Sequence, residues 1–171
     1  EDILSRQRPD GLILTPPLPD HPQLLDCLQR KGVPFASIAP RHRSEDCIGV
    51  MLREREAAAA MVEHLVSLGH RRIAHIIGDL EHGAGVWRLA GYRDGLAHAG
   101  LKEDPAYMVQ GRFSFESGVA AMRQLLALPR RPTAVFAGDD DMAVGAIWAA
   151  AEAGVSIPRD ISICGFDDTT I

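Results

Sequence analysis

The chain has 171 residues, of which 46% are hydrophobic and 24% are charged. This length and composition suit an ordinary globular protein that buries one good core or two small ones. With 18 Lys and Arg against 23 Asp and Glu, the net charge is −5, so the chain lacks the basic excess that marks most nucleic-acid-binding surfaces.

The three cysteines are Cys27, Cys47 and Cys164, and no two of them form a C-x-x-C pair. An odd number at wide spacing predicts reduced, buried thiols in a cytoplasmic protein, in preference to disulfides or metal ligands. The sequence has no run of about 18 apolar residues that would span a membrane. Its first ten residues do not resemble a signal peptide.

The first part of the chain predicts alternating helices and strands. In order these are the tail of a helix at Glu1–Arg8, a strand at Gly11–Leu14, a helix that starts near Asp20 and ends at Gly32, and a strand at Pro34–Ala39. Leu24, Leu25 and Leu28 form the apolar stripe of the helix. We expect these elements to belong to one lobe.

The segment between Arg41 and Glu56 is rich in charged residues and has no pattern that predicts a helix. One strand is possible, at Cys47–Leu52. We therefore place a domain crossing in this segment. Residues 1–52 are expected to form part of an N-terminal lobe, and residues 53–171 a C-terminal lobe.

Helices and strands alternate strictly after the crossing. The expected elements are a helix at Ala57–Leu68 closed by Gly69, a strand at Arg72–Ile77, a helix through Leu89, Tyr92, Leu96 and Ala99 closed by Gly100, a strand at Tyr107–Gly111, and a helix capped by Ser114 that carries Val119, Met122 and Leu126. This order predicts an α/β fold with parallel sheets in two lobes.

The last stretch predicts a β-α-β unit. Thr133–Ala137 is a short apolar strand, and Ile161–Phe166 is a second one. Between them, a helix capped by Asp139 and Asp140 and ended by Gly154 is expected to bury Met142, Ala146, Ile147 and Ala150 on one face. Such a unit makes the two strands parallel, with a right-handed crossover.

Polar or aromatic residues follow four strand ends of the second lobe: Asp79, Phe113, Asp139 and Asp167. In an open parallel sheet, ligands bind beyond the carboxyl ends of the strands. Carboxylates accept hydrogen bonds from hydroxyls and amines, so acids beside an arginine and an aromatic ring suit a neutral polyhydroxylated ligand or a base with exocyclic amines. Each residue also has a structural reading, as a helix cap, a turn residue or a core residue.

Several other chemistries find no support in the sequence. Residues 82–88 lead into a helix, and their glycines could bring backbone N–H groups near a ligand, but the segment is not a G-x-G-x-x-G fingerprint. A P-loop, a G-x-S-x-G elbow and an H-E-x-x-H motif are also absent.

The run from Asp139 to Asp141 predicts a solvated helix start rather than a cation site, because consecutive helical residues point in different directions. His64, His70 and His75 are spaced too irregularly to face one metal. We therefore expect no metal, no cofactor and no enzymatic activity.

Four segments, in order and in register, resemble the LacI/GalR family of bacterial repressors: RPDGLILTPPL, AAAAMVEHLVSLGHRRIAHIIGD, WRLAGYRDGLAHAGL and RPTAVFAGDDDMAVGAIWAAAEAGVSIPRDISICGFDDT. The resemblance covers nearly the whole chain. It implies a class I periplasmic-binding-protein-like fold, with two lobes and an effector held between them.

The resemblance also implies which residues contact the effector. Arg88, before Leu-Ala-Gly, matches the effector-contacting arginine of the family, and Asp167 matches its aspartate. Phe113 occupies the aromatic position that lines the pocket. Asp139 stands where sugar-responsive members often have Asn, which removes a side-chain donor. His82 matches a pocket position of some purine-responsive members, and an exposed loop histidine is the alternative reading.

Some family features are not found in this sequence. They are the helix-turn-helix, the hinge helix, and the first and last strands of the N-terminal lobe, which would leave that lobe incomplete. Arg53-Glu54 stands where the family commonly has an acidic pair, which leaves the role of that pair open.

The function that follows is the effector-binding and dimerisation core of a LacI/GalR-type transcriptional regulator. We expect a homodimer that binds a sugar or glycoside and reaches operator DNA only through an N-terminal domain outside this sequence, with no membrane partner. The first alternative is a periplasmic-type sugar-binding protein of a transport system. The second is an enzyme that uses the aspartates, for which no nucleophile-base pair is found.

Overall fold

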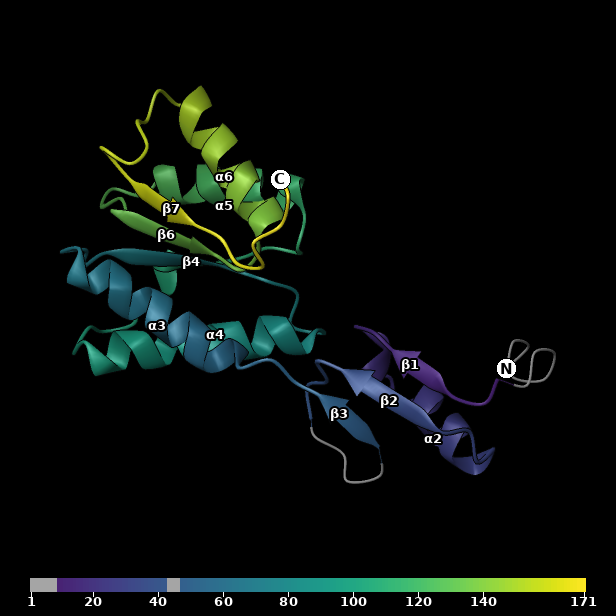
Figure 1. Cartoon of the computed structure of the whole chain (residues 1–171). Helices are drawn as coiled ribbons and strands as arrows, with labels where there is room; N and C mark the ends of the chain where they lie inside the picture. Colours follow the sequence, from purple (N-terminus) through teal and green to yellow (C-terminus); the bar gives the residue numbers. More distant parts are fainter. Residues whose placement is uncertain (1–8, 43–46) are drawn as a thin grey trace. The chain divides into compact units, whose positions relative to one another are not determined.

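The computed structural model describes residues 9–42 and 47–171. They form two compact units. One holds the described residues up to Arg53 together with Glu81–Ala84, and the other holds Glu54–Leu80 and Gly85–Ile171. Both are α/β units with an all-parallel sheet (Figure 1). The helix tail predicted at Glu1–Arg8 lies outside the described residues.

The first unit has a three-stranded sheet in the order β1-β2-β3. Its elements are β1 (Leu12–Leu14), the 3-10 turn η1 (Leu18–Asp20), α2 (Pro22–Arg30), β2 (Phe35–Ile38) and β3 (Ile48–Val50). The helix is capped by His21, whose Nδ1 accepts from the Leu24 N–H at 3.3 Å. Asp20, expected at the helix start, instead accepts from the Arg41 N–H at 2.7 Å. Of the expected leucine stripe, Leu28 is fully buried.

The second unit alternates helices and strands, as the sequence predicts. Its elements are α3 (Glu54–Ser67), β4 (Ile73–Ile77), α4 (Gly83–His98), the 3-10 turn η2 (Pro105–Tyr107), β5 (Met108–Gln110), α5 (Phe115–Leu126), β6 (Ala134–Ala137), α6 (Asp140–Glu152) and β7 (Ser162–Cys164). The strand order is β5-β4-β6-β7. The chain passes over β4 between β5 and β6, so the topological switch point, where ligands bind in open parallel sheets, lies between β4 and β6.

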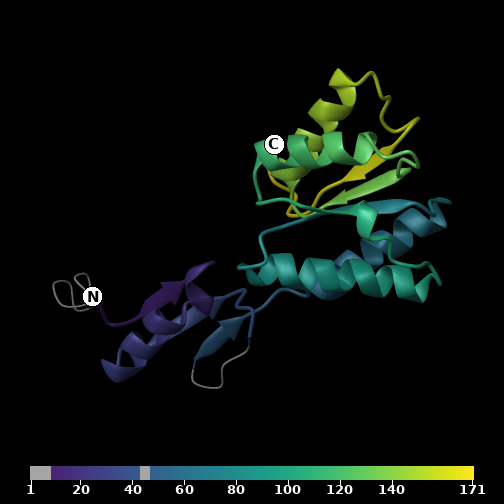
Figure 2. The same cartoon turned by 180° about the vertical axis from the view of Figure 1, so that it is seen from behind.

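Helices cover both faces of this sheet. Figures 1 and 2 show α5 and α6 on one face and α3 and α4 on the other. Ala74 and Ile76 of β4 join the core beneath α5 and α6, whereas Ile73 and Ile77 join the core beneath α3 and α4. All five residues of β4 are buried, which explains why its sequence reads as a continuous apolar run rather than an alternating one.

The glycines predicted to close helices and two of the predicted helix caps are confirmed. The four glycines expected to close helices all have a positive φ, between 63° and 95°: Gly32, Gly69, Gly100 and Gly154. The Ser114 hydroxyl accepts from the Ser117 N–H at 3.3 Å. The Asp139 carboxylate accepts from the Met142 N–H at 2.8 Å. Local residue chemistry therefore sets where these helices begin and end.

Three details differ from the expectation. Helix α3 begins at Glu54 rather than at Ala57. Glu54 and Glu56 lie in its first turn, where negative charges interact favourably with the helix dipole and stabilise the helix. Asp140 is the first residue of α6 and does not cap it, because its carboxylate binds Thr169. Ile147 was expected on the buried face of this helix but is 43% exposed.

Candidate functional site

Arg88 lies at the centre of a polar cluster in the second unit. Its side chain comes from the second turn of α4 and is almost completely buried. Nη1 donates to the Gly138 carbonyl oxygen at 2.6 Å, directly after β6. This bond fixes the guanidinium beside the switch point of the sheet.

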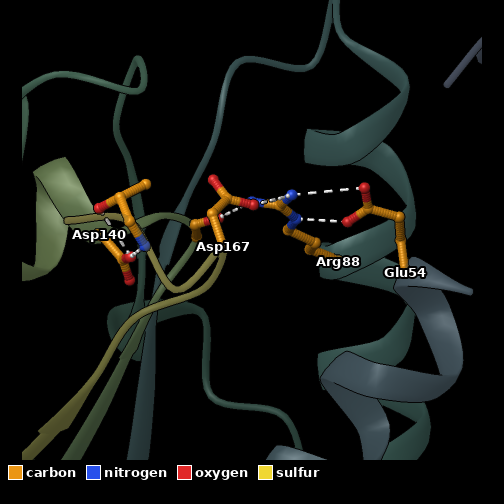
Figure 3. Close-up of polar contacts among 6 residues, drawn as sticks. Glu54, Arg88, Asp140 and Asp167 are labelled. Carbon is orange, nitrogen blue, oxygen red and sulfur yellow. Dashed lines mark hydrogen bonds and ion pairs between the residues drawn. The ribbon is translucent and has the colours of Figure 1, made fainter. Parts of the chain in front are cut away.

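Two carboxylates bind the same guanidinium, as Figure 3 shows. Glu54, from the start of α3, accepts from Nε at 2.5 Å and from Nη2 at 3.3 Å. Asp167, from the segment after β7, accepts from Nη2 at 2.7 Å. The Glu54 side chain is 4% exposed and that of Asp167 is 39% exposed. Arg88 therefore bridges a buried carboxylate to one that faces solvent.

Burial lowers the pKa of Arg88, but the hydrogen bonds and charges of Glu54 and then Asp167 outweigh this effect, so the net pKa is raised above its usual value. The residue is a permanent cation. Its charge balances one of the two carboxylates that it binds.

Two aromatic rings frame the guanidinium. The Arg88 Cζ lies 3.8 Å from the Phe166 ring centroid and 6.0 Å from that of Phe113, both within the range of a cation–π contact. The Phe113 ring also rests on the backbone at the end of β4, since a Cβ added to Gly78 would collide with it. The structure thus brings Phe113 to the cluster, although its strand is at the far edge of the sheet from β7.

Three non-glycine residues of this edge have left-handed backbone conformations: Phe113 (φ 54°), Asp167 (φ 103°) and Asp168 (φ 53°). Such conformations cost free energy and persist only where the surroundings impose them. One constraint is visible at Asp140, whose carboxylate accepts from the N–H of Thr169 at 2.7 Å and from its hydroxyl at 3.0 Å. Asp140 thereby ties the segment that carries Asp167 to the start of α6.

Asp139 is buried at the end of β6, and its Oδ1 caps α6. Burial is the main cause that raises its pKa, and the charges of Asp141 and Asp167 add to the increase. The Met142 N–H and the charge of Arg88 oppose it. Asp139 is therefore within electrostatic reach of the cluster, while part of its hydrogen-bonding capacity is used by the helix.

The other residues predicted from the sequence are His82, Asp79 and the glycines of residues 83–88. His82 belongs to the other compact unit, with Glu81–Ala84, so it is not part of the same body as Arg88. Asp79 follows β4, and its carbonyl packs tightly against Gly85 of α4. The glycines of residues 83–88, expected in a loop that leads into a helix, are already helical.

Sequence reasoning assigned no role to two members of the cluster. Glu54 was noted only as a departure from a family pattern, and nothing local indicates that it meets Arg88, which lies 34 positions along the chain. Phe166 could have been found, because it directly precedes Asp167 at the end of a strand.

The part of the chain that the structure describes holds no group of three or more His, Cys, Asp or Glu side chains arranged to bind a metal ion. No described helix is both long enough and apolar enough to cross a membrane. The three cysteines are free thiols, of which Cys27 is buried and the other two are partly buried.

Residues 62–171 match the family model described as a periplasmic binding protein-like domain. The chain belongs to this family. Within it, the chain is 35% identical over 167 residues to the HTH-type transcriptional repressor PurR of Escherichia coli O139:H28, an alignment that covers 97% of this chain and 49% of the repressor. The chain therefore spans about half the length of the curated relatives it matches.

The chain also aligns with solved structures of transcriptional regulators. A transcriptional regulator CelR–cellobiose complex aligns with a TM-score of 0.91 and 35% identity, covering 99% of this chain and 52% of that one. A regulatory protein of the LacI family from Chloroflexus aggregans aligns with a TM-score of 0.87 and 32% identity, covering 99% and 60%. These homologues are transcriptional regulators and not enzymes, and the predicted LacI-type fold is confirmed.

Proposed function

We propose that this chain is the effector-binding core of a LacI/GalR-type transcriptional regulator. It binds a small polar ligand, with a sugar or glycoside as the first choice, at the carboxyl edge of β4, β6 and β7. Arg88, Asp167, Asp139 and Phe113 contact the ligand, and His82 is an additional candidate. The names of the homologues favour a regulator over a transport protein.

The observation that carries this proposal is the Arg88 bridge between Glu54 and Asp167. Because Arg88 takes one Asp167 oxygen, Oδ1, the carboxylate is held in place while 39% of its side chain stays exposed. A pre-positioned carboxylate accepts hydroxyl donors without first losing conformational entropy. The rings of Phe113 and Phe166 lie beside it and suit the apolar face of a sugar.

The comparison with a cellobiose complex supports the sugar assignment. Asp139 stands beside this edge with its carboxylate as a second acceptor. Its capping bond to Met142 uses Oδ1, so Oδ2 is the atom that a ligand hydroxyl would meet.

The relatives are named as an HTH-type transcriptional repressor and as a transcriptional regulator in complex with cellobiose. We propose that the protein that contains this chain is likewise a regulator, which binds an effector, dimerises and reaches operator DNA through an N-terminal domain. Effector binding would shift DNA affinity by its preference for one conformation over the other. The exposed apolar residues Phe115, Ile147 and Trp148 of α5 and α6 are candidates for the dimer contact, which sedimentation equilibrium would test.

The ligand site is tested by calorimetry with cellobiose and a panel of neutral mono- and disaccharides. We expect at least one to bind, and we expect Asp167→Asn to weaken it roughly 10- to 100-fold, because a hydrogen bond to a charged group contributes about 1.5–3 kcal/mol. Asn still offers an oxygen to Arg88, so the loss reports the second carboxylate oxygen.

Asp168→Asn is the matched control, since Asp168 is the next residue, is exposed and also has a positive φ. It should leave the affinity within about twofold. If no sugar binds, or if Asp167→Asn binds as tightly as the unaltered protein, the proposed site is wrong.

A further inference from the structure

The Glu54 carboxylate occupies the face of Arg88 that would otherwise receive an anion. Nε and Nη2 form the two-pronged edge with which arginine binds carboxylates and phosphates, and both donate to Glu54. Because this pair is only 6% and 4% exposed, solvent does little to loosen it.

The other donors of Arg88 are also largely used. Nη1 donates to the Gly138 carbonyl, and Nη2 donates additionally to Asp167. Among the described residues, four of the five N–H groups of the guanidinium thus have acceptors. An incoming anion could therefore accept a hydrogen bond from only one guanidinium N–H and could not bind Arg88 in the bidentate geometry.

The surrounding charges act in the same direction. Glu54, Asp139 and Asp167 are three carboxyl groups around one cation. The charge of Asp167 contributes to the raised pKa of Asp139, which shows that these acids sense one another. Without Glu54, Arg88 would have only Asp167 as a directly bound counter-ion.

We propose that Glu54 is a specificity-determining residue, which neutralises Arg88 so that the site accepts neutral polyhydroxylated ligands and rejects phosphorylated or carboxylated ones. This inference rests on the proposed sugar site and names the charge class of its ligand. Glu54 acts through Arg88 and does not touch the ligand.

The physical basis is the unequal effect of a buried charge on the two ligand classes. A neutral hydroxyl gains hydrogen bonds from the carboxylates around Arg88. An anion loses its hydration and meets like charges, of which those of the buried Glu54 and Asp139 are only weakly screened by water. In sites where Arg is unpaired, the same residue would favour the anion.

The test measures binding of two neutral probes, glucose and cellobiose, and two anionic probes, inorganic phosphate and glucose 6-phosphate. The unaltered protein should bind each anion at least about tenfold more weakly than the better neutral probe. Glu54→Gln keeps the side-chain size and one acceptor but removes the charge. It should raise the affinity for both anions, by at least about tenfold relative to the affinity for the neutral probe.

Glu56→Gln is the matched control, because it removes the same charge two residues further along the first turn of α3. It should leave anion binding unchanged. If it strengthens anion binding as much as Glu54→Gln does, net charge rather than the Arg88 pair sets the specificity, and the proposal is wrong.

The outcomes separate this proposal from the sugar site itself. If the unaltered protein binds no sugar, the proposed function fails, while a gain of phosphate binding by Glu54→Gln still supports the role of Glu54. If Glu54→Gln does not fold, the unaltered protein still decides, because anion binding as tight as neutral-probe binding overturns the proposal. A folded Glu54→Gln that gains no anion affinity overturns it too.

Discussion

His75 is a buried histidine in the middle of β4. Its ring stacks between Tyr92 and Phe136, at centroid distances of 5.0 and 4.8 Å. Nδ1 lies 2.8 Å from the Phe136 carbonyl oxygen, and Nε2 has no hydrogen-bond partner among the described residues. A neutral ring that donates from Nδ1 fits this environment, because an imidazolium would leave a charged N–H buried without an acceptor.

We predict that this histidine makes the free energy of unfolding depend on pH. Burial is the main cause that lowers its pKa to about 4; the charges of Arg88 and Arg93 contribute to this decrease, and the hydrogen bond to the Phe136 carbonyl opposes it. Since the folded pKa lies below the unfolded value of about 6.5, the unfolded chain binds the proton more readily. The contribution of the neutral His75 to the free energy of unfolding is fully present above about pH 6.5. It decreases by about 3 kcal/mol as the pH drops toward 4.

Chemical denaturation between pH 4 and 8 measures this dependence. His75→Gln should flatten the curve between pH 6.5 and 4, even if it lowers the stability at pH 7. His98→Gln, which alters an exposed histidine paired with Glu63, should leave the shape of the curve unchanged. An unaltered slope in a folded His75→Gln variant would show that other groups cause it.

The individual residues of the site were only partly predictable. Asp167 and Phe113 were predicted because they follow strand ends, and Arg88 because the Leu-Ala-Gly after it resembles a LacI/GalR motif. Both features are local in the sequence. Glu54 and Phe166 depend on where α3 and the end of β7 meet α4 in space. No local pattern encodes that meeting, so the buried counter-ion of the key arginine is visible only in the fold.

At the scale of elements, the segment after β7 is fixed by the start of α6. Asp140 accepts two hydrogen bonds from Thr169, and a Cβ on Gly165 would collide with the Asp140 carboxylate. A loop that bears two positive-φ residues is thereby tied at a point close to Asp167. We infer that Asp140 positions Asp167 without touching the ligand.

Asp140→Ala is predicted to release this segment. The Thr169 amide should exchange with deuterium at least about tenfold faster, because one hydrogen bond to a charged group contributes about 1.5–3 kcal/mol to local stability. Asp141→Ala removes the same charge from the same helical turn at an exposed position and should not alter that exchange. Equal exchange rates in the two variants would contradict the positioning role.

Element types were more predictable than element boundaries. Gly32, Gly69, Gly100 and Gly154 mark helix ends because a left-handed residue is needed there and glycine adopts it without strain. The start of α3 was placed too late because the charged run before Ala57 has no apolar periodicity. Its Glu54 side chain is nevertheless buried, since an ion pair takes the place of apolar contact.

The whole molecule combines two units of unequal burial. The second unit has apolar clusters on both faces of its sheet. Among the described residues of the first unit, few apolar side chains are buried, and Leu14, Cys27 and Leu28 are among them. Ile13 and Ile48 on its strands are each 73% exposed. Apolar burial is the main stabilising contribution to a fold, so the first unit should be the less stable one.

We predict that the two units unfold separately. Amides of β1 and β2 should exchange with deuterium at least about a hundredfold faster than those of β4 and β6, because exchange from a buried core requires opening of the whole unit. Native-state hydrogen exchange followed by mass spectrometry measures both sets in one experiment. Equal protection in the two sheets would show that the chain unfolds as one cooperative body.

A pair of matched substitutions assigns the two transitions. Leu28→Ala empties a fully buried position in α2, and Leu125→Ala does the same in α5. Each change should cost about 2–5 kcal/mol, the transfer free energy of the lost atoms plus that of the cavity left behind. Because the two leucines lie in separate cores, Leu28→Ala should speed exchange in β1 and β2 alone, and Leu125→Ala in β4 and β6. If either substitution accelerates exchange equally in both sheets, the units are coupled more strongly than their separate cores imply.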